Sequence, residues 1–143
     1  MRILIVEDDD SCRKVLLRFL SPFGQCDAVA DGLQGVQAVQ KALDERSHYT
    51  LICLDIHMPN MDGHEAMSKI RILEEDSGVG RDRKAKIMMC TALGDALNLT
   101  DAFGGECDAY IVKPFDHARL KEQLYLMGLI PDPSAAAPKA ARS

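Results

Sequence analysis

The sequence predicts an α/β fold in which helices cover a parallel β-sheet. Four short and almost continuous apolar runs are typical of strands that are buried on both faces of such a sheet. The stretches between them carry apolar residues at helical spacing, so strand and helix alternate about five times, which favours right-handed crossovers. The four runs are Ile3 to Val6, Leu51 to Leu54, Ile87 to Cys90 and Tyr110 to Val112.

The remaining elements are expected between these strands. A helix from Cys12 to Leu20 has one apolar stripe and is closed by Pro22, a residue that commonly follows a helix end. The segment Gln25 to Ala30 has weak strand character and is expected at a sheet edge, and Ala96 to Phe103 is expected as a weaker helix. Three further stripes predict helices: Leu33, Val36, Val39 and Leu43; Ala66, Met67, Ile70 and Leu73; and Leu120, Leu124 and Met127.

Two stretches do not follow this alternation. The charged segment from Glu74 to Lys86 contains Gly78 and Gly80 and lacks an apolar period, so we expect a long, mobile and solvated loop. Residues 128–143 are rich in Pro, Ala and Ser and carry too few large apolar side chains to offset the entropy of ordering. We therefore expect one domain over residues 1–127 and a disordered tail after it.

The composition excludes several classes of protein. With 22 acidic and 17 basic residues among 143, the formal charge is -5, and no basic run suggests a nucleic-acid partner. No apolar run approaches the roughly 20 residues of a membrane span, and no signal peptide is apparent, so we expect a cytoplasmic protein without a membrane partner. Five cysteines without a CxxC pair indicate reduced core residues rather than disulfides or zinc ligands.

Polar residues follow the four apolar runs. Glu7 and Asp8 come after the first run, Asp55 after the second, Thr91 after the third, and Lys113 after the last. The carboxyl ends of parallel strands meet at one edge of the sheet, and ligands bind in the crevice there. We therefore expect carboxylates, a hydroxyl and an ammonium group in one site.

The acidic residues in this set point to a metal. Asp9 and Asp10 have a structural explanation, since acids favour a helix start, and Asp10 or Ser11 could cap the helix. Glu7, Asp8 and Asp55 would repel one another unless a cation or protons intervened. An incomplete set of oxygen ligands suits Mg²⁺ better than Ca²⁺.

Asp55 has two compatible roles, as a metal ligand or as a nucleophile. A carboxylate beside Mg²⁺ can attack phosphorus and form an acyl phosphate if positive groups neutralise the transferring oxygens. Lys113 can supply that charge, and Thr91 can supply a hydrogen bond.

These residues resemble the receiver domain of bacterial two-component response regulators, single-domain chemotaxis-type regulators included. The resemblance covers Arg2 to about Met127, and Glu74 to Lys86 is longer than the family pattern. It implies a flavodoxin-like, doubly wound sheet of five parallel strands in the order 2-1-3-4-5, flanked by five helices. Four segments carry it: Glu7-Asp8, the block from Asp55 to Gly63, Thr91-Ala92, and Tyr110 to Phe115.

The resemblance also implies a role for each site residue. Asp55 would accept a phosphoryl group from a histidine kinase or a phosphotransfer protein, and the chain would be a phosphoacceptor rather than a turnover enzyme. The other implied roles are Mg²⁺ binding by Asp8, Asp55 and the backbone carbonyl of His57, with Glu7 acting through water; phosphoryl binding by Thr91 and Lys113; an aromatic switch at Tyr110; and a cis bond before Pro114.

The predicted function is a phosphorylation-controlled switch without a DNA-binding output domain. Its downstream protein is expected on the face formed by the fourth helix, the last strand and the last helix, around Leu97 to Phe103, Tyr110 and Asp116 to Leu124. Two alternatives stay open. A metal-dependent phosphohydrolase could use Asp55 as nucleophile, although His57 stands where that class usually has a second acid. A phosphate-independent adaptor would not need the complete set of acid, threonine and lysine.

Overall fold

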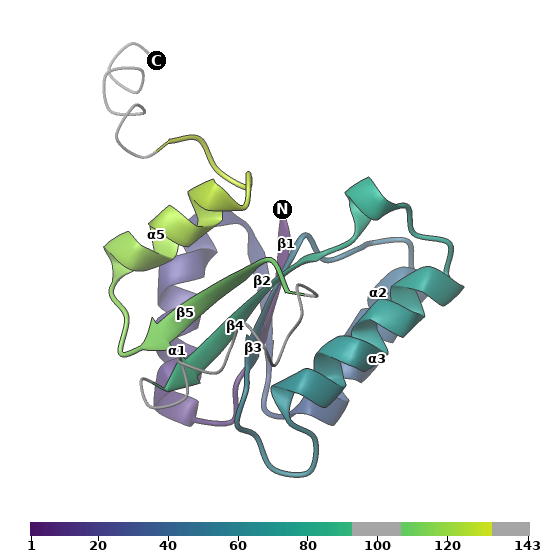
Figure 1. The fold of residues 1–143 in the computed structure, drawn as a ribbon, viewed down its shortest axis with the longest axis horizontal. Coiled ribbons are helices and arrows are strands. Elements are labelled where there is room, and N and C mark those ends of the chain that lie inside the picture. The colour runs from purple at the N-terminus through teal and green to yellow at the C-terminus, as the bar shows by residue number, and fades with distance from the viewer. Residues whose placement is uncertain (93–106, 133–143) are drawn as a thin grey trace.

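A five-stranded parallel sheet forms the centre of the molecule in the computed structural model, which describes residues 1–92 and 107–132 (Figure 1). The strand order β2-β1-β3-β4-β5 confirms the predicted fold class, and it places β2 at an edge as expected. The strands are β1 (Arg2–Val6), β2 (Gln25–Val29), β3 (Leu51–Asp55), β4 (Lys86–Ala92) and β5 (Ala109–Lys113).

Helices cover both faces of the sheet. Helices α1 and α5 lie on one face, and α2 and α3 lie on the other (Figure 1). The predicted helix from Ala96 to Phe103 and most of the predicted tail lie outside the described residues, which contain four α-helices. The helices are α1 (Asp10–Leu20), α2 (Gly32–Asp44), α3 (Gly63–Asp76) and α5 (His117–Leu126), and the short 3-10 turns are η1 (Ser21–Phe23) and η2 (Arg81–Arg83).

An aspartate side chain caps each of these four helices. The carboxylate of Asp9 accepts the backbone N–H of Ser11 at 2.9 Å, so the expectation that Asp10 or Ser11 caps α1 is wrong. Asp9 takes the cap because its backbone is extended, whereas Asp10 already has helical geometry. The equivalent caps are Asp31 for α2, Asp62 for α3 and Asp116 for α5.

Two apolar layers, one on each face of the sheet, form the core. Along β1, Ile3 and Ile5 pack toward α1 and α5, while Leu4 and Val6 pack toward α2 and α3. Cys53 and Cys90 are buried in the first of these layers, as predicted for core cysteines, whereas the other three cysteines are only partly buried. No helix in residues 1–92 or 107–132 has the length and apolarity needed to cross a membrane.

The segment from Glu74 to Lys86 differs from the solvated loop that we expected. Helix α3 continues to Asp76, and the Glu74 side chain is buried. Its carboxylate accepts the backbone N–H of Ala85 at 2.8 Å and the Arg71 guanidinium at 2.7 Å. Arg71 also donates to the Ala85 carbonyl, at 2.9 Å. The expectation fails at both ends of the segment because a buried carboxylate joins the end of α3 to the start of β4.

We expect Glu74→Ala to lower the free energy of unfolding by about 2–4 kcal/mol, because it leaves the Ala85 N–H and the Arg71 guanidinium without this buried acceptor. Urea unfolding followed by circular dichroism measures the change. Glu75→Ala is the matched control, since it removes an exposed carboxylate one residue away and should change stability by less than about 0.5 kcal/mol. Equal effects of the two variants would contradict a special role for Glu74.

Candidate functional site

The fold gathers the predicted site residues at the carboxyl edge of the sheet. Asp55 ends β3 and pairs in register with Cys90 of β4, so Thr91 is the next residue along β4. On β5, Lys113 pairs with Ala92, just beyond Thr91. Glu7 directly follows β1, which lies on the other side of β3.

Three carboxylates face one another at this edge. One oxygen from each of Glu7, Asp8 and Asp55 lies within 4.8 Å of the other two. Glu7 and Asp55 are buried, with exposed fractions of 0% and 6%, whereas Asp8 is exposed. The Lys113 Nζ lies 2.8 Å from Glu7 Oε1 and 3.4 Å from Asp55 Oδ1, so its closer contact is with Glu7.

Burial and this proximity shift the pKa of each group. Burial raises the pKa of Asp55 to about 7, and its hydrogen bond with Glu7 and the negative charge there act in the same direction. Burial acts to raise the pKa of Glu7, but hydrogen bonds with Asp55, Lys113 and the Asp9 backbone keep this pKa below its ordinary value. The pKa of Lys113 is raised, because these carboxylates outweigh burial. Glu7 is therefore ionised at neutral pH, while Asp55 retains a proton part of the time.

The donor set fits a hard divalent cation. Carboxylate oxygens are the ligands that Mg²⁺ prefers, and the exposed side chain of Asp8 keeps the cluster open to solvent and hence to water ligands. A cation here would replace the proton that Asp55 otherwise needs. The His57 backbone N–H donates to Asp55 Oδ1 at 3.3 Å, which places the main chain of His57 beside the cluster, while its side chain is exposed.

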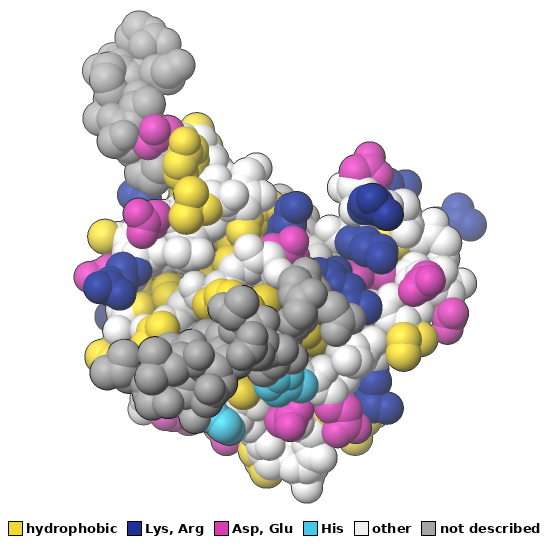
Figure 2. Space-filling view, viewed as in Figure 1, with side chains coloured by type: hydrophobic (Ala, Val, Ile, Leu, Met, Phe, Trp, Pro, Cys, Tyr) yellow, Lys and Arg dark blue, Asp and Glu magenta, His cyan; other side chains and the backbone are white. Residues whose placement is uncertain are grey.

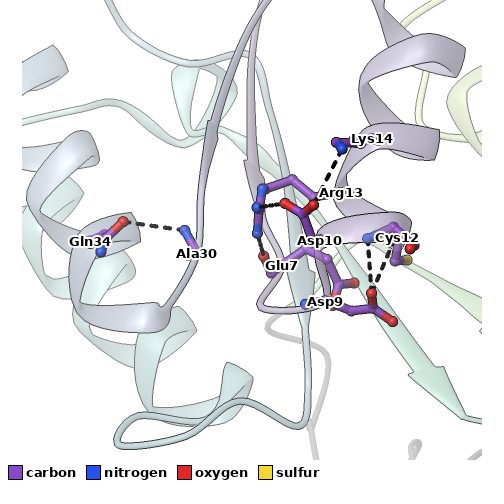
Figure 3. A network of polar contacts seen from close by, with 9 residues as sticks. Glu7, Asp9, Asp10, Cys12, Arg13, Lys14, Ala30 and Gln34 are labelled. Carbon is purple, nitrogen blue, oxygen red and sulfur yellow. Dashed lines mark hydrogen bonds and ion pairs between the residues drawn. The ribbon is translucent and has the colours of Figure 1, made fainter.

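Helix α1 fixes the backbone that follows β1 (Figure 3). The Arg13 guanidinium donates to the main-chain carbonyl of Glu7 at 2.9 Å and also pairs with Asp10. Lys14 pairs with the same Asp10 at 3.3 Å, and the Asp9 N–H donates to Glu7 Oε2 at 3.1 Å. Arg13 was not predicted as a site residue, and its one signal in the sequence is its position three residues after Asp10, at the start of a predicted helix.

Close packing at the start of α3 holds Asp55 from the other side. A Cβ on Gly63 would lie 2.6 Å from the Asp55 carbonyl oxygen, so only glycine allows this approach. The Gly63 N–H donates to the Ile56 carbonyl at 2.9 Å. The first turn of α3 therefore packs directly against the backbone of the site.

The remaining predicted residues lie toward β4 and β5. Thr91 is fully buried, and its hydroxyl makes a long contact, at 3.4 Å, with the Ala92 carbonyl. Tyr110 is half-buried and packs against the core layer of α2 and α3. Burial raises its pKa, and a hydrogen bond with Cys107 adds to the shift. The Lys113–Pro114 peptide bond is cis, as expected.

Comparison with known proteins connects this geometry to one family. Residues 3–125 match the family described as the response regulator receiver domain. Over 123 residues the chain is 34% identical to the chemotaxis protein CheY of Bacillus subtilis, covering 86% of this chain and 93% of that protein. It is 31% identical over 121 residues to CheY of Listeria monocytogenes, with coverage of 85% and 93%.

One solved structure is also similar to this chain, both in sequence and in fold. The receiver domain of a sensor histidine kinase from Pseudomonas aeruginosa superposes with a TM-score of 0.68 and 31% identity, covering 89% of this chain and 97% of that one. That structure holds a magnesium ion coordinated in its active-site cleft.

We expect Asp55→Asn to stabilise the metal-free protein by about 1–3 kcal/mol at pH 8, with a smaller gain at pH 5. The folded pKa of Asp55, about 7, lies above its unfolded value. The folded state therefore binds more protons between about pH 4 and 7, and the stability contributed by this group falls as the pH rises through that window. Asparagine does not titrate, so the variant does not lose this stability as the pH rises.

Urea unfolding in excess chelator at the two pH values measures this difference. Asp10→Asn removes an exposed acid in the first turn of α1 and should show no such pH-dependent gain. Addition of Mg²⁺ should stabilise the wild type and leave Asp55→Asn nearly unchanged. A gain of the same size at both pH values would contradict a raised pKa at Asp55.

Proposed function

The chain belongs to the response regulator receiver domain family, and from that premise we propose that Asp55 accepts a phosphoryl group in a two-component system. The donor is a phosphohistidine on a histidine kinase or a phosphotransfer protein. The observation that supports this most is the contact of the Lys113 ammonium with the buried Asp55 carboxylate, inside a cluster of three acids. This arrangement brings a nucleophile together with charges that suit a transferring phosphoryl group.

The reaction is a simple group transfer. An oxygen of the ionised Asp55 carboxylate attacks the phosphorus, the bond between phosphorus and the donor histidine nitrogen breaks, and an acyl phosphate forms. A magnesium ion held by Asp8, Asp55 and the main-chain carbonyl of His57, with Glu7 acting through water, would supply positive charge to the phosphoryl oxygens. Because the reaction consumes one donor per chain, the protein acts as a stoichiometric phosphoacceptor.

Lys113 and Thr91 bind the phosphoryl group once it is attached. In the present arrangement the closer partner of Lys113 is Glu7, at 2.8 Å, and the new phosphoryl oxygens offer it a stronger acceptor. The Thr91 hydroxyl would give up only its long contact with the Ala92 carbonyl, so a hydrogen bond to a phosphoryl oxygen is favourable. Both residues thereby change partners when Asp55 is phosphorylated.

Strand β5 transmits this change to the partner surface. It carries Lys113 at the site and Tyr110 three residues earlier, half-buried against the core. Movement of the Thr91 side chain frees space for the Tyr110 ring, and the face around β5 and α5 then favours the downstream protein. The part of this face expected from Leu97 to Phe103 lies outside the described residues. We further propose that residues 1–127 form the domain, with 128–143 as its tail.

No observation favours the phosphohydrolase alternative. His57, two residues after Asp55, has an exposed side chain and is not a carboxylate, so a second acid for leaving-group protonation is missing there.

We expect the purified protein to take up one phosphoryl group from acetyl phosphate in the presence of Mg²⁺, because the domain supplies the nucleophile and the neutralising charges itself. Intact-mass spectrometry detects the product. Asp55→Asn should abolish labelling, excess chelator should prevent it, and the control Asp10→Asn should retain it. Labelling of Asp55→Asn to the wild-type extent would exclude Asp55 as the acceptor.

We expect beryllofluoride, a phosphoryl mimic, to shift the amide resonances of β5 and α5 as well as those of the site. Thr91→Ala should keep the shifts near Asp55 and lose those at Tyr110 and α5, because the hydroxyl that responds to the phosphoryl group is gone. The coupling is typically about 1–3 kcal/mol, or 5- to 150-fold in partner affinity. Unchanged shifts at α5 in Thr91→Ala would rule out this route.

A further inference from the structure

We propose that the hollow between α3 and η2 binds a small anion that carries two or more phosphate groups. This hollow, the basic hollow, lies near the amino end of β4, at the opposite edge of the sheet from Asp55, and has a volume of about 400 Å³. The inference does not rest on phosphorylation of Asp55. The charged residues that line the basic hollow are Arg71, Arg81, Lys84 and Lys86 with Glu75 and Asp108.

The charge balance of the basic hollow is opposite to that of the whole chain. Four cations stand against two lining carboxylates, and the buried Glu74 paired with Arg71 reduces the surplus to one positive charge, in a protein of net charge -5. The Asp108 carboxylate is already compensated, because it lies 3.2 Å from Arg71 Nη2 and accepts the Ile87 N–H at 2.9 Å. The positive charge that remains on this surface favours an anion over a cation or a neutral ligand.

Arg81 and Lys84 carry this surplus. Within residues 1–92 and 107–132, neither side chain lies within ion-pair distance of a carboxylate, and Lys86 reaches Asp108 only at 4.0 Å. Figure 2 shows Lys and Arg side chains over η2 and between η2 and α3, with Asp and Glu side chains at the end of α3. Three of the four lining cations come from the short basic stretch Arg81 to Lys86, and the fold adds Arg71 from α3.

The basic hollow is organised before a ligand arrives. The Arg71 side chain is only 15% exposed and is fixed by Glu74, by the Ala85 carbonyl and by Asp108. The Arg83 N–H donates to the Gly80 carbonyl at 2.9 Å, which closes the turn that presents Arg81. Fixed donors reduce the entropy lost when an anion binds.

The size and the lining define the class of ligand. The volume falls within the range of about 300–1,000 Å³ that is usual for small-molecule sites. Ala85 is the only apolar residue of the lining, so the ligand surface is polar. An adjoining hollow of about 290 Å³ shares Lys84 and Lys86, and its further charged or titratable lining residues are Arg83, His48 and the acid Asp82. A ligand with phosphate groups at some distance from one another, such as a diphosphate or a nucleotide, fits this extended lining better than a single phosphate.

Binding in the basic hollow would also reach β5. Arg71 and Lys86 are the cationic partners of Asp108, and Asp108 directly precedes β5. An anion that binds these two cations competes with Asp108 for them. The amide resonances of Asp108 and Ala109 should therefore respond to the ligand.

The test is a titration with pyrophosphate at constant ionic strength, without Mg²⁺, followed by amide chemical-shift mapping and calorimetry. The Asp55→Asn variant serves as the host, so the outcome is independent of phosphorylation. We expect saturable shifts at Lys84 to Ile87 and at Asp108, with a Kd below about 1 mM. Arg81→Ala combined with Lys84→Ala should weaken binding at least about 10-fold.

Lys69→Ala is the matched control, because it removes an exposed cation of α3 that does not line the basic hollow, and it should leave the Kd unchanged. If the double variant does not fold, Arg81→Ala alone, which removes only an exposed side chain, should also weaken binding. Shifts that grow without saturation, equal shifts with sulfate, or an unchanged Kd in the folded double variant would each overturn the proposal.

Discussion

Two buried carboxylates, Glu7 and Asp55, face each other at the carboxyl edge of the sheet, and the Lys113 ammonium contacts both. Like charges so close and so little hydrated are unfavourable unless a proton or a cation is shared between them. The parallel register imposes this proximity, because it brings the ends of β1, β3 and β5 to one edge. The chemistry of the site follows from this constraint, since a metal ion and a phosphoryl group both change how the charges are balanced.

Most of this arrangement could be predicted from the sequence, but the residues that hold the helices and strands in place around the site could not. The strand runs and the residues after them follow from periodicity and from the geometry of parallel sheets, so Asp55, Thr91 and Lys113 could be placed together in advance. The Asp9 cap could not be assigned, because several neighbouring side chains can cap and the choice depends on backbone angles. Burial of Glu74 rests on a hydrogen bond to Ala85, eleven residues away, which no local pattern reveals.

The contrast between Asp55 and Glu74 separates a reactive acid from a structural one. Both are almost completely buried. Glu74 faces a guanidinium and a backbone N–H, so its charge is fully compensated by groups that stay in place. Asp55 faces a second carboxylate and shares its ammonium with that neighbour, so its compensation is incomplete. Burial alone therefore does not mark a functional acid, whereas incomplete compensation does.

The hydrogen bond between Glu74 and Ala85 holds both ends of the connection between α3 and β4, so the length of the chain between them can vary. Glu74 fixes the chain at Ala85, while Gly78 lies between them in the left-handed region, at φ +74°, with open space around its Cα. Lengthening a flexible loop between fixed ends costs little, about 0.6 kcal/mol for each doubling. Insertions near Gly78 can therefore accumulate during evolution, or carry an attached reporter group, without displacing the strand that leads to Thr91.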